Sequence, residues 1–134
     1  MDAITQSIWI GNFLDAKDEA ALSKAGIHSI LCLDGCLAGR SADELGVKQI
    51  EVVESIDGPG NSPAKFLRAV RLLKDLTSEH APVLVHCHAG QSRSAAVVCK
   101  YFMQEGDSLG EAMHRITSKR RVAIVAGLQE ALDF

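Results

Sequence analysis

Short apolar runs alternate along the chain with segments in which apolar residues recur at helical spacing. The runs at residues 7–10, 27–33, 47–53 and 83–85 are rich in branched side chains, which favours strands. The 83–85 run is continuously apolar, as is typical of a central parallel strand. Helical spacing predicts helices at residues 15–24, from 62 onward, at 94–103, from 108 onward, and around 128–132.

Capping and breaking residues mark where these predicted helices begin and end. Gly26 is expected to end the first helix, Ser62 and Pro63 to begin the second, and Pro82 to follow it. The pair Ser108 and Glu111 matches a capping box. The inward residues expected in the first helix are Ala16, Ala20, Ala21 and Ala25, and the apolar face expected in the second is Phe66, Leu67, Val70, Leu73 and Leu76.

Alternating strands and helices predict the α/β class, with a mostly parallel central sheet flanked by helices on both faces. The length of 134 residues suits one domain, 1–134, and 47% apolar with 23% charged residues is typical of soluble globular proteins. In such sheets a ligand binds where the carboxyl ends of strands meet the amino ends of helices.

Charge and cysteine usage narrow the function classes. The net charge is −3 without a long basic run, so no nucleic-acid partner is indicated. No apolar run approaches the ~18 residues of a membrane span, and the amino terminus does not resemble a signal peptide. The four cysteines form no CxxC pair and lack zinc-like spacing, so neither a metal nor a cofactor is expected. We therefore expect a cytoplasmic protein with free thiols, monomeric by default.

The stretch VLVHCHAGQSRSAAVV places a cysteine, a glycine and an arginine between a predicted strand and a predicted helix. Backbone N–H groups of a tight turn at Ala89 and Gly90 can bind an oxyanion, and the helix amino terminus adds its dipole. The fork of Arg93 can hold two phosphate oxygens, and the same field lowers the pKa of Cys87. No other cysteine has an arginine six residues later, since Cys32, Cys36 and Cys99 are followed there by Ala38, Ala42 and Glu105.

The segment HCHAGQSRS resembles the signature of the cysteine-dependent protein phosphatases, and the small chain is similar to their dual-specificity branch. The stretch IWIGNFLDAKDEAALSKAGIHSILCL is similar to the first strand–helix–strand of that branch, so the resemblance covers nearly the whole chain. It implies a hydrolase that dephosphorylates phosphotyrosine, phosphoserine and phosphothreonine in phosphoproteins through a phosphocysteine intermediate. It also implies that no metal takes part.

The same resemblance implies a role for each residue of the motif. Cys87 would be the nucleophile, Arg93 the phosphate-binding arginine, Ser94 the hydroxyl that stabilises the leaving thiolate, and His86 the residue that orders the loop and helps lower the cysteine pKa. The expected backbone N–H donors to phosphate are His88, Ala89, Gly90, Gln91 and Ser92.

A general acid is expected on a separate upstream loop, because the leaving oxygen must be protonated. Asp57 is the first candidate, since it opens the glycine-containing segment DGPGNSP between a strand and a helix. Glu54 is the competitor, and Glu51 falls within the predicted strand. Ionised Cys87 together with protonated Asp57 predicts a bell-shaped pH profile that peaks somewhat below neutrality.

Several alternatives stay open at the level of sequence. A rhodanese-type sulfurtransferase also uses a cysteine loop at a strand–helix junction, and relatives act on non-protein phosphoesters such as phosphoinositides, RNA 5′ ends or small molecules. A phosphate-binding module without activity is a further alternative. Cys36 is considered as a disulfide partner of Cys87, and Arg120 and Arg121 are expected to be a solvated pair.

Overall fold

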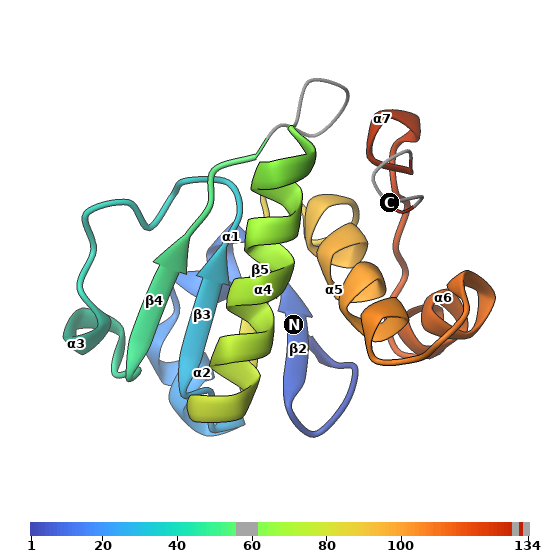
Figure 1. The fold of residues 1–134 in the computed structure, drawn as a ribbon. Coiled ribbons are helices and arrows are strands. Elements are labelled where there is room, and N and C mark those ends of the chain that lie inside the picture. The colour runs from blue at the N-terminus through green and yellow to red at the C-terminus, as the bar shows by residue number, and fades with distance from the viewer. Residues whose placement is uncertain (56–61, 130–131, 133–134) are drawn as a thin grey trace.

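The computed structural model describes residues 1–55, 62–129 and 132 (Figure 1). Their five-stranded sheet has the order β1-β2-β5-β3-β4. The strands are β1 (Asp2–Ala3), β2 (Ile8–Gly11), β3 (Ser29–Cys32), β4 (Gln49–Val52) and β5 (Val83–His86). Strands β2, β5, β3 and β4 run parallel, and only the short edge strand β1 is antiparallel to its neighbour. The predicted α/β class with a mostly parallel central sheet is therefore confirmed.

Helices cover both faces of this sheet. They are α1 (Phe13–Ala16), α2 (Glu19–Ala25), α3 (Ala42–Leu45), α4 (Pro63–Glu79), α5 (Arg93–Gln104), α6 (Leu109–Thr117) and α7 (Ala126–Gln129). Figure 1 shows α4 and α5 in front of the sheet, with α1 and α2 behind it. Side chains alternate between the faces, so Val83 and Val85 pack with α4 and α5, whereas Leu84 packs with α2.

The structure confirms the predicted end of α2 and the predicted starts of α4 and α6, and it contains the capping interactions expected there. Ser62 accepts a hydrogen bond from the backbone of Lys65 at the start of α4. Ser108 and Glu111 form the expected capping box at α6. Gly26 ends α2 with φ of 73°, a left-handed conformation that glycine adopts without a steric penalty.

Some sequence predictions about the elements are wrong. The single helix predicted over 15–24 is two helices, because Asp18 caps a new helix and accepts a hydrogen bond from the backbone of Ala21. Ala20 is exposed rather than inward, and Leu67 is exposed on α4. The strand β1 and the helix α3 were not expected, since each is too short to show a hydrophobic period.

Only part of the last predicted helix lies within the described residues. Helix α7 ends at Gln129, and of the remaining predicted residues only Leu132 is described. Among the described residues, no helix combines the length and apolar character needed to cross a membrane.

Candidate active site

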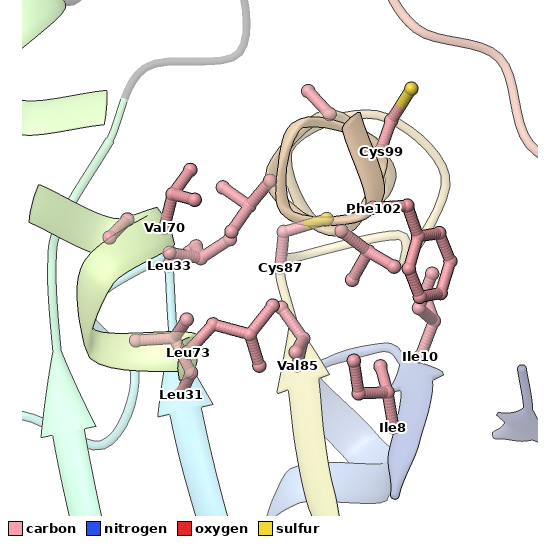
Figure 2. Close-up of a cluster of buried hydrophobic side chains, with 14 of the residues drawn as sticks. Ile8, Ile10, Leu31, Leu33, Val70, Leu73, Val85, Cys87, Cys99 and Phe102 are labelled. Atoms are coloured by element: carbon pink, nitrogen blue, oxygen red, sulfur yellow. The ribbon is translucent and has the colours of Figure 1, made fainter. Parts of the chain in front are cut away.

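The Cys87 loop, residues 87–93, joins the central strand to the helix packed over it. His86 is the last residue of β5 and Arg93 is the first residue of α5, so Cys87 lies at the carboxyl edge of the sheet. Figure 2 shows its side chain between the end of β5 and the start of α5, above Val85. Only 2% of Cys87 is exposed, yet the residue lines an open pocket. The other lining residues are His88, Ala89, Gln91, Ser92, Arg93, Ala123 and Val125.

The surroundings of Cys87 favour its thiolate form. Burial by itself raises the pKa of the thiol, but hydrogen bonds from the Ser94 hydroxyl and from the backbone of Ser94, Gly90 and Ser92 lower it further than burial raises it. The Sγ atom of Cys87 lies 3.3 Å from the hydroxyl oxygen of Ser94. The net pKa lies below the ordinary value, which makes the sulfur a better nucleophile near neutral pH.

Arg93 connects this loop to the segment after β4. Its Nη1 donates to the backbone oxygen of Ser55 at 2.9 Å and lies 3.4 Å from that of Leu33. Its Nε is buried and has no hydrogen-bond partner among the described residues. An unpaired buried donor is costly, so this N–H, on a residue that lines the pocket, is suited to an anion.

His86 is fully buried beneath the loop. Its Nδ1 lies 3.4 Å from the backbone oxygen of Cys87 and 3.9 Å from a carboxylate oxygen of Asp34. Burial lowers the pKa of His86 below its usual range, although the Asp34 carboxylate opposes this effect. The imidazole is therefore neutral at pH 7, and its contact with the loop is a hydrogen bond without a positive charge.

Gly90, within the loop, has φ of 69° and lies close to the backbone of Gly11. A Cβ atom at this position would lie 2.5 Å from the backbone oxygen of Gly11 and 2.6 Å from Nη2 of Arg120. Arg120 Nε donates to the Gly90 oxygen at 2.8 Å, and Nη1 pairs with Asp2 at 2.8 Å. The expectation that Arg120 is solvated is therefore wrong, because the residue holds the loop from behind; Arg121 is exposed.

Two further segments brace the Cys87 loop. The backbone N–H of Ala123 donates to the Gln91 oxygen at 2.9 Å, and that of Val125 donates to the Ser92 hydroxyl at 3.1 Å. On the other side, the Phe13 ring stacks on His88 with centroids 4.4 Å apart. Each of these contacts joins residues more than 30 positions apart, so no local pattern in the sequence predicts it.

Two of the three carboxylic acids considered as general acid lie within the part of the chain that the structure describes. Asp57 lies outside the described residues, and its role as the general acid stays a prediction. Glu51 lies in β4, as expected, and accepts a hydrogen bond from the Gln49 side chain. Glu54 is exposed, and its carboxyl group lies beside Gly35 rather than in the lining of the pocket.

All four cysteines are free thiols, and Cys32 and Cys99 are buried. Cys36 lies 4.0 Å from Nε2 of His86, at the base of the Cys87 loop. The proposed pairing of Cys36 with Cys87 has no test in this reduced arrangement and stays a prediction.

Comparison with known proteins places the chain among a group of enzymes. The family model described as "Dual specificity phosphatase, catalytic domain" matches residues 8–132. Dual specificity protein phosphatase 1 of Arabidopsis thaliana is 30% identical over 121 residues, which are 90% of this chain and 60% of that protein. The human dual specificity protein phosphatase 22 is 32% identical over 125 residues, with 92% and 66% covered. The chain thus spans about two thirds or less of the length of these two relatives.

Solved structures show the same architecture. Human DUSP28 superposes with a TM-score of 0.85 at 24% identity, covering 99% of this chain and 93% of the other. The human tyrosine phosphatase-like serine/threonine/tyrosine-interacting protein gives 0.81 at 24% identity, with the same coverage. At this level of identity the likeness shows the fold alone.

Proposed function

Since the chain belongs to the dual specificity phosphatase family, we propose that it is a metal-independent protein phosphatase. It hydrolyses phosphotyrosine, phosphoserine and phosphothreonine through a phosphocysteine intermediate. One observation carries the proposal: the same open pocket is lined by a cysteine with a lowered pKa and by an arginine whose buried Nε–H has no partner in the part of the chain that the structure describes. This arrangement supports attack on the phosphorus of a bound dianion.

In the first step, phosphate binds in the Cys87 loop. The backbone N–H groups of residues 88–92 and the guanidinium of Arg93 hold its oxygens, as the family motif implies. Sγ of Cys87 attacks phosphorus, and the bond from phosphorus to the ester oxygen breaks. Asp57 gives its proton to that oxygen, which leaves as an alcohol or phenol.

In the second step, water attacks the phosphocysteine. Asp57, now a carboxylate, takes the proton of the water, and the sulfur–phosphorus bond breaks. The Ser94 hydroxyl, 3.3 Å from the sulfur, stabilises the departing thiolate and restores the resting enzyme. Neutral His86 fixes the start of the loop through the Cys87 carbonyl.

The linkage of Arg93 to Ser55 supports the choice of Asp57 as the acid. Ser55 is the last described residue before the segment that contains Asp57, and its carbonyl accepts from Arg93. The phosphate-binding arginine thereby holds the chain only two residues before the candidate acid. Glu54 is adjacent to Ser55 and is held by the same link, but its exposed carboxyl group lies beside Gly35 and outside the pocket lining, so it remains the second candidate.

The lining of the pocket favours phosphoprotein substrates. Among the described residues, its lining carries no fixed positive charge apart from Arg93, whereas phosphoinositides and RNA 5′ ends present additional phosphates. His88, stacked on Phe13, gives the pocket an aromatic edge against which a phosphotyrosine ring can pack. Non-protein phosphoesters and a rhodanese-type reaction remain the alternatives.

We further propose that residues 1–134 act as one catalytic domain, monomeric and cytoplasmic. The four cysteines lack the paired spacing of a disulfide framework, which supports a reducing compartment. Size-exclusion chromatography of the chain tests the first property, and cell fractionation tests the second.

The decisive experiment measures phosphate release from phosphotyrosine and phosphothreonine peptides with a metal chelator present. The wild-type protein should turn over both, Cys87→Ser should lose at least about 10⁴-fold in kcat, and Cys99→Ala should retain the activity. Acid-quenched wild-type enzyme should carry one phosphoryl group on Cys87 by mass spectrometry. Full turnover by Cys87→Ser, or faster release of thiocyanate from thiosulfate and cyanide than of phosphate, would refute the proposal.

A further inference from the structure

A second group of reactive side chains lies beneath the Cys87 loop. Cys32, Asp34 and Cys36 come from the end of β3 and the loop after it, and His86 ends the adjacent strand β5. One ligand atom from each of the four lies within 4.8 Å of the others. Cys87 is not a member of this group.

We propose that these four residues bind a zinc ion. Two thiolates, an imidazole and a carboxylate form a donor set that zinc prefers, and structural zinc sites have four tetrahedral ligands. Zinc bonds of about 2.0–2.3 Å place tetrahedral ligands about 3.3–3.8 Å apart. The measured separations are 3.5 Å from Cys32 Sγ to Asp34 Oδ1 and 4.0 Å from Cys36 Sγ to His86 Nε2. All four ligand atoms lie within 4.8 Å of one another, so the widest pair must close by at most about 1 Å to reach tetrahedral spacing.

The backbone holds the ligands in position before any metal arrives. Cys32 and His86 are opposite one another in the register of β3 and β5. The backbone N–H of Cys36 donates to Asp34 Oδ1 at 2.9 Å, which fixes the carboxylate between the two cysteines. Gly35, with φ of 79°, provides the turn that brings Cys36 back toward Cys32.

The imidazole is also supported from outside the cluster. With its proton on Nδ1, His86 donates to the Cys87 carbonyl, 3.4 Å away, and leaves Nε2 for the metal. Zinc-binding histidines commonly donate their second N–H to a backbone carbonyl in this way. The ion would therefore be linked to the nucleophile loop through one residue without occupying the substrate pocket.

Burial indicates a closed site that is loaded from one side. Cys32 and His86 are fully buried, and the Asp34 side chain is 8% exposed. Cys36 is half-buried and offers the entry. The site matches no known sequence motif. The spacing Cys-x-Asp-x-Cys supplies three of the ligands, and the fourth, His86, lies 50 residues after Cys36.

The test uses Co²⁺ and Zn²⁺ titrations of the full chain, reduced by a phosphine. Wild type should bind one Co²⁺ with thiolate charge-transfer and tetrahedral d–d absorption, and Zn²⁺ should displace it. Cys36→Ser and Asp34→Asn should weaken Zn²⁺ binding by about 100-fold or more, since even outer partners of zinc ligands contribute about 10- to 100-fold. Cys87→Ser and Cys99→Ser should bind as wild type does.

Two controls separate the outcomes. Zn²⁺ should raise the melting temperature of wild type and of Cys87→Ser but not of Cys36→Ser, whose circular dichroism checks that it folds. Absence of stoichiometric binding to wild type would overturn the proposal. So would binding that is lost in Cys87→Ser and kept in Cys36→Ser, which would locate the metal in the substrate pocket. Neither result depends on phosphatase activity.

Discussion

The loops after β3 and β5 follow neighbouring strands at the same edge of the sheet. Their surroundings shift the pKa of the Cys36 and Cys87 thiols in opposite directions. In the Cys87 loop, hydrogen bonds from Ser94 and from backbone amides outweigh burial and lower the pKa of the thiol. In the loop after β3, burial and the Asp34 carboxylate raise the pKa of Cys36 to about 12. Burial raises the pKa of both thiols, so the polar groups that face each sulfur decide the difference between them.

The contrast shows how one sheet edge can hold two different sites. Amide N–H groups and a guanidinium make the first loop suited to an anion. A carboxylate, two thiols and an imidazole make the second suited to a cation. His86 belongs to both, because its ring contacts the Cys87 carbonyl on one side and Cys36 on the other.

Apart from loss of Cys87 itself, the largest expected effect comes from removing the guanidinium that distinguishes the Cys87 loop. Arg93→Lys keeps one positive charge but loses the planar fork and the link to Ser55. We expect kcat/KM for a phosphotyrosine peptide to fall by about 10²- to 10³-fold. Arg71→Lys, on the exposed face of α4, is the matched control and should be unchanged. Equal activity of Arg93→Lys and wild type would remove the arginine from the mechanism.

The next effect tests Asp57, the acid proposed for the anion-binding loop. Asp57→Asn should lower kcat by about 10²-fold with phenyl phosphate and much less with an activated nitrophenyl ester, whose leaving group needs no proton. The alkaline limb of the wild-type pH profile should also disappear, because that limb reports loss of the acid's proton. If Glu54→Gln shows this leaving-group dependence instead, Glu54 is the acid.

Ser94→Ala should reduce the difference in thiol pKa between Cys87 and Cys36. The hydroxyl lowers the pKa of Cys87, so its removal raises that pKa. Because the thiolate is the active form, the acid limb of activity and of iodoacetamide inactivation should move to higher pH. We expect kcat to fall about tenfold, equivalent to one hydrogen bond of about 1.4 kcal/mol. An unchanged acid limb would mean that the amides alone set the pKa.

The smallest expected effect concerns the support behind the Cys87 loop. Arg120→Ala removes the hydrogen bond to the Gly90 carbonyl and the ion pair with Asp2. A loosened loop should cost about fivefold in kcat/KM, which corresponds to about 1 kcal/mol. The adjacent and exposed Arg121→Ala is the matched control. Similar losses in both variants would assign the effect to general surface charge.

The sequence by itself determined the architecture and the position of the nucleophile motif. Apolar periodicity and helix caps are local properties, so they predicted β5, α4, α5 and α6 and the parallel sheet. The spacing from Cys87 to Arg93 also predicted an anion-binding loop from the sequence, because both residues lie in one short segment. The split between α1 and α2 was missed, since the competing cap at Asp18 interrupts an otherwise continuous helical pattern.

Only the tertiary structure decided which distant residues meet that loop. Arg120, Ala123 and Phe13 contact it from other elements, and no pattern in the chain pairs them with it. The same reason applies to the proposed zinc site, whose fourth ligand joins the others through the pairing of β3 with β5. Local propensities specify elements, whereas contacts between elements depend on how the sheet brings its strand ends together.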